Sequence, residues 1–211
     1  MKRFRDLPLL CAWSVVLGSG AAAAAEKPFE GVVTFRLQGD SPMTMRHLVK
    51  GARTRVEYVQ IPSHLLLVDR RAGPTVMLSP ESKEYLVSEA HDPQAEPQPW
   101  PRVAATGRKE TIAGHPCEHF MVGEGDYAMD YCVARGLGHD SVAMPEGAAA
   151  PGAWEELVKR YPDGFFALSA ALGSDTASPI MVATLIERTE LADALFVPPA
   201  DYKEQKTRTS E

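Results

Sequence analysis

The sequence predicts an α+β fold, in which a largely antiparallel β-sheet carries a few helices against one face. From Phe29 to Glu89, apolar residues recur at every second position in short runs separated by turns, as in an antiparallel meander. Residues 154–161 instead place Trp154, Leu157 and Tyr161 at the three- and four-residue spacing of a helix face. Residues 165–172 form a second helix candidate, because this apolar segment is followed by Gly173.

The strand boundaries follow from the turn residues between the alternating runs. Pro62, Pro74 and Pro80 each interrupt the pattern and separate one run from the next. Residues 91–101 contain four prolines, so this segment is expected to be an extended connection rather than a central strand. The predicted strands are residues 29–37, 43–50, 53–60, 64–70, 75–79, 83–88 and 110–112, a hairpin that contains both Cys117 and Cys132, and residues 179–190.

The N-terminal 25 residues have the organisation of a cleavable secretion signal. Three basic residues within Met1–Arg5 precede an apolar run, and Ala21–Ala25 supply the small residues of a cleavage site. An uncleaved membrane anchor is the alternative, but the apolar run is shorter than the ~20 residues that span a bilayer. Cys11 lies inside this run, too early for a lipoprotein cysteine. We therefore expect a periplasmic protein with one domain over residues 26–203 and a frayed charged tail over 204–211.

Charge and hydropathy restrict the partners of the mature chain. Removal of residues 1–25 takes away three basic and one acidic residue, so the formal net charge changes from −6 to −8. An acidic domain without a basic cluster argues against nucleic acid as a partner. The apolar stretches after residue 25 are too short to cross a membrane as helices, so the mature chain is not expected to span one. The oligomeric state is left open.

The mature chain retains two cysteines, Cys117 and Cys132, which are expected to form a disulfide. A two-residue turn at Glu124-Gly125 would place Cys117 directly opposite Cys132 and His119 opposite Asp130. An exported protein oxidises such a pair. A metal site and a redox centre are the alternatives, although the spacing is not that of a Cys-x-x-Cys motif.

Several short motifs, taken in order, resemble those of an uncharacterised bacterial periplasmic domain family, the domain of unknown function 4412. The segment Ala105–Glu118 carries the most characteristic string, Ala-Thr-Gly-Arg-Lys-Glu-Thr-Ile-Ala-Gly-His-Pro-Cys-Glu. The resemblance covers most of residues 29–203. The remaining matches are Phe29 and Gly31; Lys50, Gly51 and Arg55; Pro80, Lys83 and Tyr85; and Phe196, Pro199 and Tyr202.

This family is similar in outline to the LolA and LolB lipoprotein carriers. The resemblance implies an open half-barrel of antiparallel strands with helices on its concave face, and such a cavity could hold an acyl chain. It transfers no functional residue by position. The alternating pattern supplies the candidate cavity lining: Phe29, Val33, Phe35, Met43, Met45, Val56, Tyr58, Leu66, Val68, Val76 and Leu78.

The sequence contains no motif that specifies a reaction, and an enzyme and a cofactor are not expected. Ser63 and His64 are adjacent and would face opposite ways on a strand. Asp126 and Asp130 are interpreted as polar hairpin residues without an identified partner.

Three functional hypotheses remain open. The first is a binder of an apolar ligand, either a lipid or an acylated protein, and the second is an envelope interaction module with a filled core. The third is a copper-binding protein, in which Met43, Met45 and His47 would supply soft ligands from one strand face.

Overall fold

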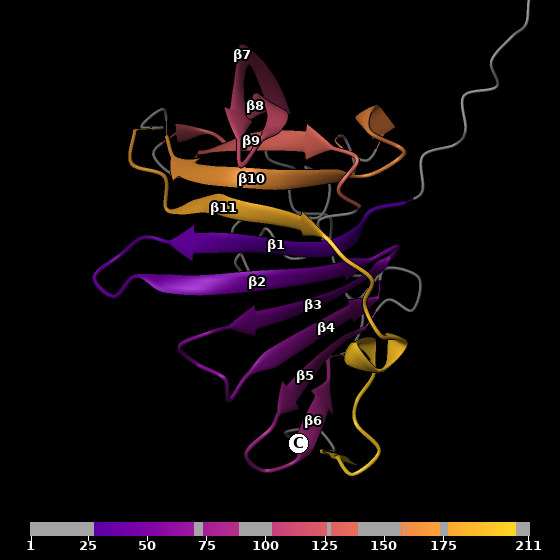
Figure 1. Ribbon diagram of the computed structural model, residues 1–211. Coiled ribbons are helices and arrows are strands. Elements are labelled where there is room, and N and C mark those ends of the chain that lie inside the picture. The colour runs from indigo at the N-terminus through magenta and orange to yellow at the C-terminus, as the bar shows by residue number, and fades with distance from the viewer. Residues whose placement is uncertain are drawn as a thin grey trace, which may run out of the picture.

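The described part of the chain is almost entirely β-structure and forms one twelve-stranded sheet (Figure 1). The computed structural model describes residues 28–69, 74–88, 103–125, 128–138, 157, 159–173 and 177–205. The sheet order is β12-β6-β5-β4-β3-β2-β1-β11-β10-β9-β8-β7. The strands are β1 (Glu30–Leu37), β2 (Met43–Lys50), β3 (Arg53–Tyr58), β4 (Leu65–Asp69), β5 (Thr75–Ser79), β6 (Glu84–Val87), β7 (Val103–Ile112), β8 (His115–Val122), β9 (Met129–Arg135), β10 (Phe165–Leu172), β11 (Met181–Arg188) and β12 (Lys203–Glu204).

The first six strands confirm the meander that the alternating pattern predicts. Each of β1 to β5 pairs antiparallel with the next strand along the chain. The first strand also pairs with β11 on its other side, so the N-terminal strand lies in the middle of the sheet (Figure 1). Gly31 is required at this junction, because a Cβ there would collide with the backbone carbonyl of Glu187. The close approach of β1 to β11 therefore explains the glycine of the Phe-x-Gly motif.

The predicted α+β class is wrong, because the described residues are almost entirely strands of one large curved sheet. The helices expected on its concave face are not among the elements of the described residues. Residues 165–172, predicted as a helix, form β10. Alanine and leucine favour helices, but β10 lies between β9 and β11, and seven of its eight residues are buried. Burial on both faces of a central strand outweighs the intrinsic helix preference. The similarity to the LolA and LolB carriers is limited to the outline of a curved antiparallel sheet.

Half of the other predicted helix, residues 154–161, lies outside the described residues. Leu157, Lys159 and Arg160 have helical conformation, and Tyr161 packs its ring edge-on against Phe120 of β8. No helix in the described residues is both long and apolar enough to cross a membrane. The expected signal segment, residues 1–25, and the proline-rich connection, residues 91–101, also lie outside the described part.

Contacts between strands that are not neighbours in the sheet show that the sheet is curved. The ring of His47 on β2 lies with its centroid 5.6 Å from that of Phe166 on β10. Two strands, β1 and β11, separate β2 from β10 in the sheet order. Neighbouring strands are about 4.8 Å apart, so a flat sheet would separate these backbones by about 14 Å. The face of β1–β3 that carries Phe35, His47 and Val56 is therefore concave, and we call it the concave face.

The C-terminal segment packs on the opposite face of β1–β3. The 3-10 helix η2 (Asp193–Phe196) brings Phe196 into a small cluster with Val32 and Leu48. Lys203–Glu204 then add β12 as a short parallel strand beside β6 (Figure 1). Glu204, assigned from sequence to the frayed tail, pairs with Tyr85, and residues 206–211 lie outside the described residues.

Candidate functional site

The predicted disulfide is present and joins β8 to β9. The Cα atoms of Cys117 and Cys132 are 5.3 Å apart. The predicted register is wrong by two residues, because His119 faces Cys132 and Cys117 faces Ala134. Val122 and Met129 form the last pair of the hairpin, so its connection is longer than the two-residue turn expected at Glu124-Gly125. A shift of two keeps every side chain on its face, and the disulfide therefore links diagonal rather than directly opposite residues.

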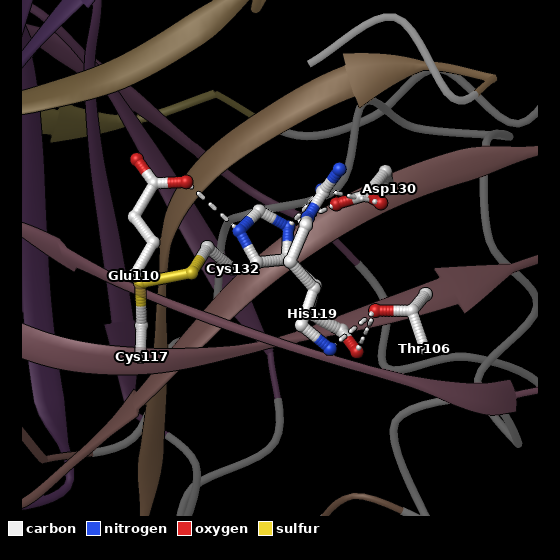
Figure 2. Close-up of a disulfide and its surroundings, with 7 residues drawn as sticks. Thr106, Glu110, Cys117, His119, Asp130 and Cys132 are labelled. Atoms are coloured by element: carbon white, nitrogen blue, oxygen red, sulfur yellow. Dashed lines mark hydrogen bonds and ion pairs between the residues drawn. A yellow bond between two sulfur atoms is a disulfide. The ribbon is translucent and has the colours of Figure 1, made fainter.

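His119 lies beside the disulfide and contacts two carboxylates (Figure 2). Its Nδ1 is 2.5 Å from Oδ1 of Asp130, and its Nε2 is 3.0 Å from Oε2 of Glu110. His119 and Asp130 are 1% and 3% exposed, whereas the Glu110 side chain is 47% exposed. The imidazole thus connects a buried carboxylate on β9 to an exposed carboxylate on β7.

Arg108 extends from a bulge in β7 and pairs with Asp130, the buried carboxylate of this cluster. The β7–β8 register shifts between Ala105 and Lys109, and Gly107 within this interval has a φ of 77°. The bulge directs the Arg108 guanidinium to Asp130, to which Nη2 donates at 3.0 Å. The hydroxyl of Thr106 donates to the carbonyl of His119 and fixes the bulge to β8. Sequence reasoning missed this bulge, because it placed the start of the strand at Glu110.

Asp130 is a buried, paired carboxylate, which corrects its interpretation as a solvated hairpin residue. A buried carboxylate is stabilised only where cations and hydrogen-bond donors compensate for its lost hydration. Arg108 and His119 supply this compensation. The alternation of His119 and Asp130 on one hairpin face was the available signal, and the expected register already placed them opposite each other. Asp126, interpreted in the same way, lies outside the described residues.

Loss of the disulfide is expected to destabilise the fold without abolishing the charge cluster. Replacement Cys117→Ser should lower the free energy of unfolding by about 3 kcal/mol, because the bridge joins residues 15 positions apart and so restricts the unfolded chain. Chemical denaturation under oxidising conditions measures this difference. Thiol titration of the unfolded wild-type mature chain should detect no free thiol. An unchanged midpoint in the variant would show that the bridge does not contribute to stability.

The predicted cavity lining is divided between two faces of the sheet. Strand register places eight of the eleven residues on the concave face or its continuation, and Phe29, just before β1, belongs to the same buried core cluster. Val76 and Leu78 are a correction, because they face Leu67 and Leu65 of β4 and therefore project from the opposite face to Leu66. The cause is the register of β5, which reverses the alternation expected from the sequence. Phe29, Val33, Phe35, Met45 and Val56 are buried, whereas Met43, Tyr58, Leu66 and Val68 are partly exposed.

Two buried polar side chains on the concave face have polar atoms without a hydrogen-bond partner among the described residues. They are Nδ1 and Nε2 of His47 and Oγ1 of Thr54. His47 is wholly buried between the rings of Phe35 and Phe166. Desolvation lowers the pKa of His47 to about 3, so the ring is neutral at physiological pH. A neutral imidazole in this position can donate one hydrogen bond and accept another.

The structure places the predicted copper ligands on one face of β2, where one of them packs between aromatic rings. Met43 and Met45 share the concave face with His47, at neighbouring positions along β2. The Phe35 and Phe166 rings pack against the imidazole, with centroids 5.0 and 5.6 Å away. Ser63 and His64, expected to face apart, are instead in hydrogen-bond contact at 2.9 Å in the turn before β4.

The described chain contains a second group of side chains with metal-ligating atoms, next to the disulfide. One ligand atom each from Glu110, His119 and Cys132 lie within 4.8 Å of one another. Cys132 is oxidised in the disulfide and is not available to a metal in this state.

The comparisons with known proteins identify a family and a fold. A solved structure entitled "Structure of PNGF-II in C2 space group" matches with a TM-score of 0.54 at 12% identity. The match covers 86% of this chain and 32% of that chain, so this protein spans about a third of its length. This level of identity supports a shared fold alone. No curated protein shows a significant match. The model of the "Domain of unknown function (DUF4412)" matches residues 29–202, and the chain therefore belongs to the DUF4412 family.

Proposed function

We propose that this chain is an exported periplasmic protein that binds an apolar ligand, a lipid or an acylated chain, on its concave face without catalysing a reaction. The observation that carries the proposal is the coincidence of two features on that face. Partly exposed apolar side chains line β2–β4, and buried polar atoms without a described partner lie beside them. Ligand sites generally combine an apolar lining with a few well-placed polar groups.

The apolar strip consists of Met43, Tyr58, Leu66 and Val68, which continue the buried core of β1–β3 toward solvent. An acyl chain laid along this strip would remove their exposed apolar surface from water, which stabilises the complex by roughly 25 cal/mol per Å². Burial raises the pKa of Tyr58, so its hydroxyl stays protonated and can donate to a ligand oxygen.

Thr54 and His47 supply the polar component beyond this strip. Each unpartnered buried polar atom costs about 1–3 kcal/mol relative to one that is hydrogen-bonded. Groups of this kind call for an explanation such as a bound water, an ion or a ligand. Both side chains are buried, so a ligand oxygen would reach Thr54 Oγ1 or a His47 nitrogen only when neighbouring side chains move aside, and it would then recover part of that cost.

Export is the part of the proposal that rests on residues 1–25 and on the disulfide. The basic, apolar and small-residue order of the N-terminus is that of a secretion signal. Disulfides persist in oxidising compartments such as the periplasm.

A second candidate is an envelope interaction module with a filled core. The observation that favours it is the direct contact of Phe35, His47 and Phe166, which fills the β1–β10 side of the interior with side chains. Such a module would present its surface to a protein partner and would bind no lipid.

Replacement Leu66→Gln tests the proposed ligand surface. We expect the variant to bind a fluorescent fatty-acid analogue about tenfold more weakly, which corresponds to about 1.4 kcal/mol. Leu185→Gln is the matched control, because Leu185 is 48% exposed and faces Thr34, on the side of β1 away from Phe35. Fluorescence titration of delipidated mature protein measures both. Equal affinities in the two variants, or no binding by the wild type, would contradict the proposal.

A further inference from the structure

The disulfide and its neighbours contain a complete set of ligands for a tetrahedral zinc ion, with two sulfurs, an imidazole and a carboxylate. Glu110 faces Cys117 directly across β7 and β8, and His119 faces Cys132 directly across β8 and β9 (Figure 2). The side chains of these four residues therefore converge from three adjacent strands. The combination of cysteine, histidine and a carboxylate is one that zinc accepts.

The spacing of the ligand atoms fits a zinc ion. Tetrahedral bonds of about 2.0–2.3 Å place ligand atoms about 3.3–3.8 Å apart. The Nε2 atom of His119 and Oε2 of Glu110 are 3.0 Å apart, and both lie within 4.8 Å of the Cys132 sulfur. Cys117 Sγ is bonded to the Cys132 sulfur in the oxidised state, and breaking this bond would free it to move to the fourth ligand position.

The orientation of His119 is a second, independent observation. Zinc-bound histidines generally donate the other ring N–H to a carboxylate, which fixes the tautomer and aims the free nitrogen at the metal. The Nδ1 atom of His119 lies against buried Asp130, and Nε2 points toward Glu110 and the cysteine pair (Figure 2). Nη2 of Arg108 donates to Asp130 at 3.0 Å and also lies 2.6 Å from His119 Nδ1, so both groups face this ring nitrogen and leave Nε2 on the side of the cysteines. The supporting contacts of a metal site are thus already formed around the oxidised cysteines.

We propose that reduction of the disulfide converts this cluster into a zinc site ligated by Cys117 Sγ, Cys132 Sγ, His119 Nε2 and Glu110 Oε2. A dithiol reductant transfers two electrons and two protons to the S–S bond, which breaks to give two thiols, and the reductant becomes a cyclic disulfide. Zinc then displaces the two thiol protons and any proton on Nε2. Oxidation of the cysteines by a disulfide-forming oxidant returns two electrons to that oxidant and releases the metal. The proposed ligands lie on β7–β9, away from the apolar strip on β2–β4, and their binding of zinc does not depend on the ligand proposed for that strip.

Metal titration of the oxidised and reduced mature protein tests this inference. The full mature chain is reduced, freed of reductant under anaerobic conditions, and titrated with Co²⁺ and then Zn²⁺. We expect the oxidised protein to bind no metal at this site. The reduced protein should bind one Co²⁺ with the charge-transfer absorption of thiolate ligation, and Zn²⁺ should displace it. Absence of thiolate-to-cobalt absorption in the reduced protein would overturn the proposal, whether that protein is folded or unfolded.

Variants distinguish zinc ligation by all four residues from ligation by the two free thiols alone. Asp130→Asn should weaken zinc binding by about 10- to 100-fold, the usual cost of losing the partner of a ligating histidine. Glu110→Gln should weaken it while leaving the disulfide of the oxidised protein intact. Glu118→Gln is the matched control, because Glu118 contacts Arg160 and Tyr161 on the other side of β8. Equal zinc affinity in Glu110→Gln and Glu118→Gln would show that the cysteines bind zinc without the cluster, and would overturn the proposed ligand set.

Discussion

Replacement Asp130→Ala is expected to lower the free energy of unfolding by about 3–5 kcal/mol, the usual cost of removing one partner of a buried ion pair. Asp130 accepts from Arg108 and contacts His119, and both it and the imidazole are almost completely buried. Its loss removes the buried anion that compensates Arg108 and His119 and leaves a cavity in its place. Urea denaturation monitored by circular dichroism measures the change.

Asp193→Ala is the matched control for this prediction. Asp193 also contacts two cations, Lys50 and Arg53, but its side chain is 73% exposed. Water replaces a partner at such a site, so the effect there should be much smaller. If Asp130→Ala were no more destabilising than Asp193→Ala, the cluster around His119 would not be a stabilising feature of the fold.

Acidification is expected to destabilise the protein through His47. Burial lowers the pKa of this imidazole from 6.5 to about 3, so the folded state resists a proton that the unfolded state accepts. The contribution of the neutral ring is complete above pH 6.5 and is lost as the pH falls toward 3. At pH 4 the loss amounts to about 3–4 kcal/mol, from about 1.4 kcal/mol per pH unit.

The variant His47→Leu isolates this effect from the titration of carboxylates. It removes the titrating group and its unpartnered nitrogens while conserving most of the buried volume. We expect the variant to be more stable than wild type at pH 4, and the difference between the two to shrink as the pH rises to 7. Stability curves measured at several pH values test this. A pH-independent difference between them would show that His47 is not protonated on unfolding.

The sequence predicted the strands wherever a buried face imposed an alternating pattern. β1–β6 follow this pattern because one side of the meander is apolar, and β11 was found from its apolar centre. β10 could not be recognised in this way, since Phe165–Leu172 is buried on both faces and therefore lacks alternation. The first part of β7 was missed for the opposite reason, because the residues that follow Val103 are exposed along an edge of the sheet and have no buried face to impose an alternating pattern.

The candidate site was predictable in part. The pairing of Cys117 with Cys132 followed from their number and the expected compartment, independently of exact register. The proximity of His119 and Asp130 was predictable from the hairpin, but Arg108 was not, because it reaches Asp130 through a bulge that has no clear sequence signature. Val76 and Leu78 were assigned to the wrong face, because the alternation phase changes between β4 and β5.

Ligand binding on the concave face is tested most directly by native mass spectrometry of the mature protein purified from the periplasm without detergent. The proposal predicts a population heavier than the apo chain, whose added mass is lost on organic extraction and belongs to a lipid or acyl compound. His47→Leu and Leu66→Gln should reduce that population, and Leu185→Gln should preserve it. A bare chain mass in all preparations would contradict ligand binding and favour the filled-core module. A mass increase due to copper, lost in His47→Leu, would contradict it in favour of a metal site.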